Sequence, residues 1–74
     1  MEKYQEIAIN TPSIKLDQFL KWAAIAATGG EAKILISSGQ IKVNNKIEMQ
    51  KGKKLLNGDI VEVKKEKYQV VFKS

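Results

Sequence analysis

The stretch TGGEAKILISSGQIKVNN, residues 28–45, decides the fold class because it changes from a helical pattern to a hairpin pattern within one segment. Thr28 followed three residues later by Glu31 is a capping-box pattern, which marks a helix start. Gly39 supplies the left-handed residue that commonly ends a helix. Asn44–Asn45 suits a two-residue hairpin turn, since Asn tolerates positive φ. The stretch therefore predicts a helix followed directly by a β-hairpin.

The apolar spacing defines the buried side of this helix, which we expect to end at Ser38. Ala32, Leu35 and Ile36 fall on one stripe at helical spacing. Ile34 lies outside the stripe, and we expect it to pack on another element.

A second amphipathic helix precedes this one, at about residues 15–24. Its apolar positions are spaced i, i+3, i+4 and i+7: Leu16, Phe19, Leu20 and Ala23. The other side carries Lys15, Gln18 and Trp22, which lie within about 60° of one another on a helical wheel.

Alternating polar and apolar residues predict strands at residues 6–10, 41–43, 46–49, 60–63 and 68–72. Asn57–Gly58 is a further turn signal, and Lys64 to Lys67 form the charged tip between the last two strands. The predicted order is β-α-α-β-β-β-β. Two consecutive helices followed by strands imply an α+β fold, with the helices packed on one face of a small, mostly antiparallel sheet. We expect the N-terminal strand to join the sheet made by the C-terminal strands.

Composition bounds the class of protein. The 74 residues allow one domain, and the chain has no cysteine and no histidine. No disulfide framework, thiolate metal site or nucleophile–histidine pair can be assembled, and the eight acids show no metal-ligand spacing. The polar N-terminus lacks a signal-peptide apolar region, and the longest apolar run, residues 22–27, is too short to span a bilayer. We therefore expect a monomeric, cytoplasmic, non-enzymatic protein without cofactor or metal.

The positive charge is concentrated in the middle of the chain. Of the formal net charge of +5, all lies between Lys15 and Lys54, since eight lysines and three acids fall there. Such a field favours a polyanionic partner. All thirteen basic residues are lysine, which suits phosphate contact and shape recognition better than base-by-base readout.

An ordered set of short motifs resembles the S4 RNA-binding domain. The residues that carry the resemblance are Lys15-Leu16-Asp17, Phe19-Leu20, Thr28, Ala32, Leu35-Ile36, Gly39, Ile41, Val43-Asn44, Lys53-Lys54 and Gly58 to Val63. The match covers about residues 14–63 of the one domain predicted for residues 1–74, with strand extensions at both ends. The chain is most similar to the small stand-alone S4 proteins of bacteria, the YaaA-like group. The resemblance implies the two-helix αL motif on a small sheet, with structured RNA bound along a basic groove. In this family the RNA is often ribosomal RNA or tRNA.

Three positions depart from the family pattern. Thr28–Gly29 stands where the family has Ser-Arg, Ile34 replaces the second of two basic positions, and Asn45 replaces the turn glycine. The first two remove cations expected at the RNA, and the third is conformationally tolerable.

The candidate RNA contacts are lysines, two glycines and one aromatic residue. The phosphate-contact candidates are Lys15, Lys33, Lys51, Lys53 and Lys54, with Lys42 and Lys46 as weaker ones. Gly29 and Gly30 leave the start of the second helix open to an anion, and Trp22 offers a stacking surface for an unpaired base. The alternatives are a solvated lysine face, plain capping by Thr28 and Glu31, and a tryptophan that flanks the core.

Three polar residues have mainly structural interpretations. Asn44 shapes its turn, Asp59 follows Gly58 in another turn, and Asp17 is either an acid at a helix start or a partner for a nearby lysine. Tyr68 and Phe72 share one face of the last strand and are expected in the core.

The sequence thus predicts an RNA-binding module that docks on structured RNA, with ribosomal RNA or a ribosome assembly intermediate as the leading target. The ribosomal target comes from the family resemblance alone. The rivals are a protein-interaction module derived from an S4 domain and a DNA-associated protein.

Overall fold

The computed structural model describes residues 4–73 of the chain, and its main element is a five-stranded sheet. The strands lie in the order β1-β7-β6-β3-β4: β1 is Tyr4–Ala8, β7 is Glu66–Val71, β6 is Ile60–Val63, β3 is Ile41–Val43 and β4 is Lys46–Ile47. β1 pairs with β7 in parallel, and the other three pairings are antiparallel.

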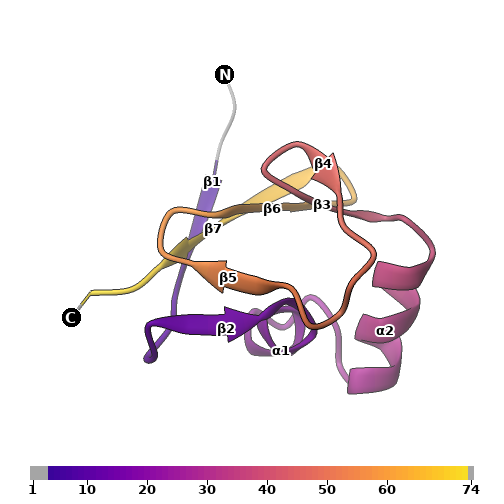
Figure 1. Cartoon of the computed structure of the whole chain (residues 1–74), viewed down its shortest axis with the longest axis horizontal. Helices are drawn as coiled ribbons and strands as arrows, with labels where there is room; N and C mark the ends of the chain where they lie inside the picture. The colour runs from indigo at the N-terminus through magenta and orange to yellow at the C-terminus, as the bar shows by residue number, and fades with distance from the viewer. Residues whose placement is uncertain (1–3, 74) are drawn as a thin grey trace.

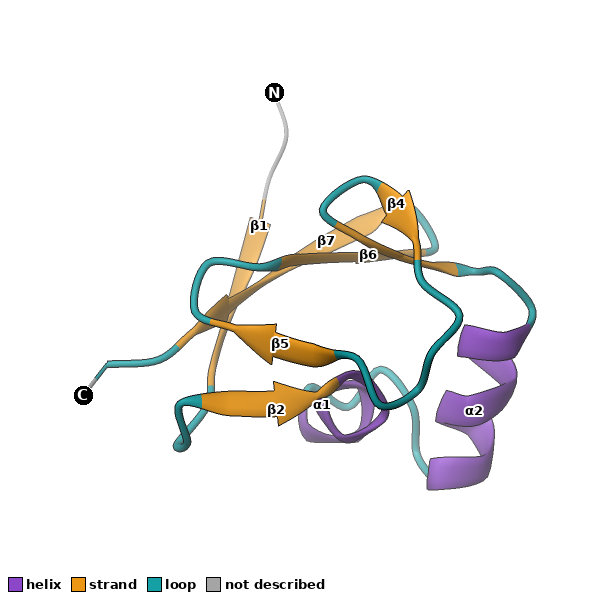
Figure 2. Ribbon diagram, in the orientation of Figure 1, coloured by secondary structure: helices purple, strands orange, loops and turns teal. Residues whose placement is uncertain are grey.

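Two helices and a second, smaller sheet lie on one side of this sheet (Figures 1 and 2). The helices are α1, Leu16–Trp22, and α2, Gly29–Ser37, which pack against each other. The smaller sheet is the antiparallel pair of β2, Ser13–Lys15, and β5, Lys54–Leu56. The molecule therefore has an α+β fold, in which the helices and the smaller sheet cover one face of the five-stranded sheet.

The hydrophobic core lies between the sheet and this layer. Its buried residues come from both helices, from β3, β5, β6 and β7, and from the loops that follow β1 and α1: Ile9, Leu16, Phe19, Leu20, Ala26, Ala32, Leu35, Ile36, Ile41, Val43, Leu55, Val61, Val63 and Val70. Tyr68 and Phe72 are partly buried and pack against this cluster, as predicted. A core of this size supports a net stability of only about 3–5 kcal/mol in a chain this short.

All seven predicted helices and strands are present in the predicted order, and the N-terminal strand joins the C-terminal ones. The structure adds β2 and β5, which the sequence did not indicate. Each has three residues, which is too short for a period-two pattern to stand out. One prediction was wrong as a result. Lys15 has an extended backbone (φ −72°, ψ 149°) in β2, so it is not on the helical face that carries Gln18 and Trp22.

The first helix ends two residues earlier than predicted because of the backbone at Ala24, which has a φ of 60°. The N–H of Ile25 donates to the Leu20 carbonyl at 2.9 Å, and the N–H of Ala24 donates to the Lys21 carbonyl at 3.0 Å. These two bonds form a Schellman motif, which satisfies carbonyl groups left open at the helix end.

The second helix begins at the predicted cap and ends at Ser37, one residue before the predicted end. The Thr28 hydroxyl accepts a hydrogen bond from the Glu31 N–H at 3.1 Å, and Gly39 has a φ of 77°. Ala32, Leu35 and Ile36 are buried. The expectation for Ile34 was wrong, since its side chain is 66% exposed and does not pack into the core.

Asn44 and Asp59 fasten two turns together. The amide of Asn44 donates to Asp59 Oδ1 at 3.2 Å, and its Oδ1 accepts from the Ile60 N–H at 3.0 Å. Asp59 Oδ2 accepts from the Leu56 N–H at 2.8 Å. Asn44 and Asp59 therefore have structural roles in these two turns, as predicted.

Within the described residues, no helix is both long and apolar enough to cross a membrane.

Candidate nucleic-acid interface

The small β2–β5 sheet brings together two lysines that are far apart in the sequence. In its ladder Lys15 lies opposite Lys54, and Ile14 lies opposite Leu55. Ile14 and Leu55 face the core, so Lys15 and Lys54 lie side by side on the outer face, where both are exposed.

A turn before β5 adds two more lysines to the same place. The Lys53 N–H donates to the Gln50 carbonyl at 3.1 Å and closes a turn that exposes Lys51. The carbonyls of Lys53 and Lys51 accept hydrogen bonds from the Leu16 and Asp17 N–H groups, at 2.8 and 3.1 Å. The turn thereby satisfies N–H groups that the start of α1 would otherwise leave open. These two hydrogen bonds fasten the turn to the helix.

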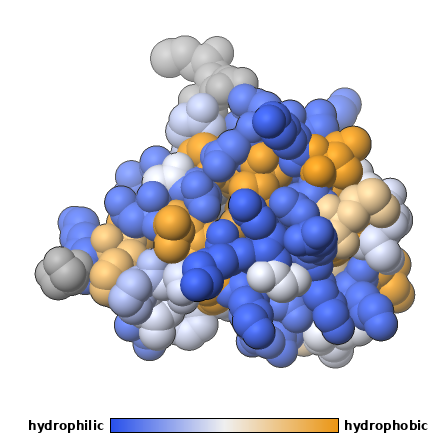
Figure 3. Space-filling model, viewed as in Figure 1, coloured by the Kyte–Doolittle hydropathy of each residue, from blue (hydrophilic) through white to orange (hydrophobic). Residues whose placement is uncertain are grey.

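Four of the five predicted phosphate-contact residues thus converge at the start of α1. We call them the lysine surface: Lys15, Lys51, Lys53 and Lys54. Within residues 4–73, none of their ammonium groups is in an ion pair. In the space-filling view, a broad hydrophilic area occupies the middle of the face where β2, β5 and the preceding loop lie (Figure 3). Four positive charges with no internal partner leave this surface able to bind an anion.

The fifth residue, Lys33, lies on α2, the helix that packs against α1. It is exposed near the beginning of that helix, where Gly29 and Gly30 are also exposed. A Cβ added at Gly29 would lie 4.0 Å from Lys21 Nζ, and one at Gly30 would lie 3.9 Å from the Thr28 hydroxyl. Packing therefore does not require glycine at either position.

Lys21 is a candidate that the sequence analysis missed. Its ammonium group lies near the N-terminal end of α2, because α1 and α2 pack together. The sequence showed only that Lys21 lies off the buried stripe of its helix. Nothing in the periodicity of one helix tells where the end of the other helix lies.

Trp22 is positioned by a long-range hydrogen bond. Its indole Nε1 donates to the carbonyl of Ala8, at the end of β1, at 2.7 Å, while 52% of the side chain is exposed. The predicted grouping with Lys15 on one helical face is wrong, since Lys15 belongs to β2. About half of the side chain is therefore exposed while its indole N–H is bonded to the end of β1.

Lys42 and Lys46 fall on opposite faces of the five-stranded sheet. Lys42 pairs with Ile47 and Glu62 and lies between the buried Ile41 and Val43, so it is on the face away from the helices. Lys46 lies opposite Val43 and so is on the helix side. The structure does not bring Lys42 to the lysine surface.

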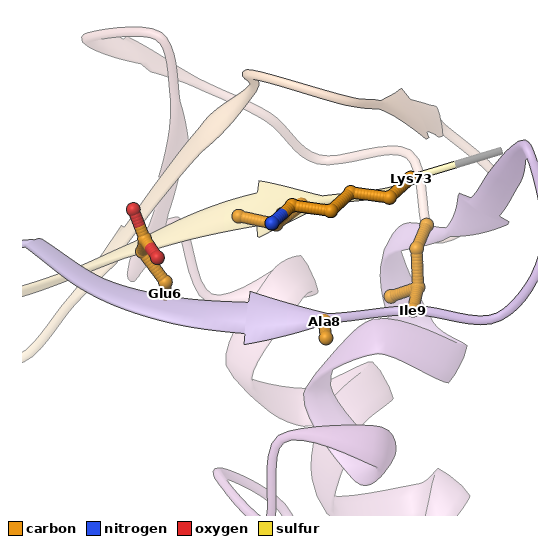
Figure 4. A pocket seen from close by; sticks show the side chains of 5 residues that line it. Glu6, Ala8, Ile9 and Lys73 are labelled. Atoms are coloured by element: carbon orange, nitrogen blue, oxygen red, sulfur yellow. The ribbon is translucent and has the colours of Figure 1, made fainter.

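A separate pocket lies where β1 and β7 end (Figure 4). It is lined by Glu6, Ala8, Ile9, Val71 and Lys73, and the Lys73 side chain extends along it in the direction of Glu6. None of these residues is a predicted contact. Within residues 4–73, no group of three or more acidic side chains is placed so that it could hold a metal ion.

Comparison with known proteins identifies the family. The S4 domain model matches residues 7–71, which is most of the chain. The chain belongs to the S4 domain family. The resemblance seen in the sequence motifs is confirmed, and so is the fold that it implied.

Two bacterial relatives share most of their length with the chain. The probable ribosome maturation protein RlbA of Bacillus subtilis is 42% identical over 57 residues, covering 77% of the chain and 80% of RlbA. The putative RNA-binding protein YbcJ of Escherichia coli is 35% identical over 60 residues, covering 81% of the chain and 86% of YbcJ.

Two solved structures have a similar fold. The solution structure of YbcJ, described as having an αL motif involved in RNA binding, matches with a TM-score of 0.70 at 30% identity and covers 96% of the chain and 91% of YbcJ. The ribosomal protein S4e of Thermoplasma acidophilum matches with a TM-score of 0.66 at 24% identity and covers 86% of the chain and 34% of S4e. The second likeness concerns the fold alone.

Proposed function

We propose that this protein is a non-enzymatic RNA-binding module of the cytoplasm that acts as a monomer and docks on structured RNA through the lysine surface. The observation that carries the proposal is the convergence of Lys15 and Lys54 with Lys51 and Lys53 at the start of α1, with no carboxylate paired to them within residues 4–73. Like charges held side by side repel, and a polyanion relieves that repulsion.

The preferred target is ribosomal RNA, either in a ribosomal subunit or in an assembly intermediate, with tRNA as the other structured RNA to test. The name of RlbA, a probable ribosome maturation protein, supports the ribosome, and the description of YbcJ supports RNA. Recognition rests on shape and phosphate contacts, because the chain has no arginine to pair with base edges.

The start of α2 offers a second contact within the same interface. Gly29 and Gly30 allow a phosphate to approach the helix N-terminus, where the dipole is positive, and Lys21 and Lys33 add charge nearby. Glu31 opposes this contact in part. The exposed ring of Trp22 contributes stacking on an unpaired base.

The test is a binding titration of the purified protein against ribosomal RNA, tRNA and duplex DNA over a series of salt concentrations. Each lysine–phosphate contact contributes a log–log slope of roughly −0.7 to −0.9. We expect a slope of roughly −3 to −5 and a preference for one folded RNA. Equal binding to duplex DNA would favour the DNA-associated rival, and weak binding without preference would mean that the lysines form a generic solvated surface.

One observation favours a protein-interaction module as the second candidate. Ile34 is 66% exposed at a position where the family has a basic residue, and Ile47 and Met49 are also exposed. Ile34 lies on α2, whereas Ile47 shares the far face of the sheet with Lys42, so Ile34 itself is the candidate contact. Capture of a partner that survives nuclease treatment and is lost in Ile34→Lys would support this candidate.

A further inference from the structure

The two tight hairpins of this protein have nearly the same turn conformation and opposite side-chain chemistry. The β3–β4 turn is Asn44–Asn45, with φ of 52° and 71°. The β6–β7 turn is Lys64–Lys65, with φ of 53° and 67°. Both turns consist of two residues between antiparallel strands, and both residues of each are left-handed.

Turn geometry explains the asparagines but not the lysines. A left-handed backbone brings the side chain close to a carbonyl oxygen, and asparagine is among the few residues that tolerate it. Asn44 also uses its side chain, through Asp59 and Ile60. Lys64 and Lys65 are exposed, and no hydrogen bond or ion pair within residues 4–73 engages their ammonium groups.

The Lys64–Lys65 turn lies at the same end of the sheet as the segment that leads from β4 to the lysine surface. Val63, the last residue of β6, pairs with Ile41, and the carbonyl of Ile41 accepts the Glu48 N–H at 3.0 Å. Glu48 follows β4 and begins the segment that leads to Lys51. The turn and that segment therefore flank the same strand.

We propose that the Lys64–Lys65 turn is a second phosphate-contact site, which binds the backbone of the same RNA outside the lysine surface. The proposal rests on the proposed RNA-binding function and adds a site to it. Two exposed cations at the tip of the hairpin add a second group of positive charge at the end of the sheet, beyond Glu48. A phosphate bound there pairs with ammonium groups that make no ion pair within residues 4–73.

The test replaces the turn with the residues of the other hairpin. Lys64→Asn with Lys65→Asn keeps the left-handed backbone at a lower steric cost, so the melting temperature should rise. Binding to deproteinised ribosomal RNA should weaken, and the log–log salt slope should become shallower by roughly 1.4–1.8, for two lost contacts. A higher melting temperature together with weaker RNA binding would show that a contact was lost while the domain stayed folded.

Lys73→Gln is the matched control, because Lys73 is exposed beyond the opposite end of β7. Each single turn variant should reduce the slope more than this control does. An unchanged slope in the double variant, or an equal reduction per charge in Lys73→Gln, would overturn the second site while leaving the lysine surface in place. If the wild-type protein binds none of the RNAs, both the proposed function and this site fail together.

Discussion

The polar side chains of the turns and the lysines of the interface serve opposite purposes in the same small molecule. Thr28, Asn44 and Asp59 each hold a backbone N–H, and each is used within the fold. Within residues 4–73, the side chains of Lys51 and Lys53 make no hydrogen bond or ion pair, although their carbonyls hold the start of α1. The backbone of this turn is structural, and its lysine side chains are exposed.

This difference shows which substitutions separate folding from binding. A change that removes a hydrogen bond from a turn should act on stability, whereas under the proposed function a change confined to a lysine side chain should act on RNA binding. Lys15 and Lys54 are the exception, because their proximity affects both.

The largest effect on stability is expected for Asp59→Ala. This change removes the acceptors of the Leu56 N–H and the Asn44 amide, and we expect the free energy of unfolding to fall by about 2–3 kcal/mol. Chemical denaturation measures it, with Glu66→Gln as an exposed carboxylate control that should change stability by less than about 0.5 kcal/mol. An equal loss in both variants would mean that Asp59 is not a fastening residue.

A smaller effect is expected at the start of α2. Thr28→Ala removes the acceptor of the Glu31 N–H and should cost about 1 kcal/mol of stability, while Thr28→Ser should cost much less. Thermal unfolding of the two variants distinguishes them. If the alanine and serine variants melt together, the hydroxyl contributes nothing to the cap.

The smallest effect on stability is expected for a variant that should become more stable while it binds RNA more weakly. Lys54→Gln relieves the repulsion from Lys15 across the β2–β5 ladder and should raise stability by roughly 0.2–1 kcal/mol. The same variant should bind RNA more weakly. A loss of stability would show that the lysine stem packs usefully against its neighbours, which would contradict the division between the two groups of side chains.

The sequence predicted the parts of the fold that depend on local signals. The apolar spacing of α2, the cap at Thr28, the left-handed Gly39 and the Asn44–Asn45 turn were all predicted correctly. Each depends on residues within one or two turns of chain, where propensity and periodicity act directly.

The rest depended on contacts between distant segments. β2 and β5 are strands only because they pair with each other, and Ala24 and Lys64 adopt left-handed backbones that their residue types disfavour. For the candidate interface, the sequence indicated which lysines to consider. The pairing of Lys15 with Lys54, and the position of Lys21 near α2, follow from tertiary structure.

The salt dependence of RNA binding by a variant with Lys51→Gln, Lys53→Gln and Lys54→Gln tests the central claim most directly. The backbone bonds to α1 remain, so the domain should stay folded by circular dichroism. The log–log slope should become shallower by roughly 2.1–2.7, and affinity at 0.1 M salt should fall on the order of 100-fold. A slope equal to that of the wild type, or no greater change than in Lys73→Gln, would contradict a lysine surface that docks on RNA.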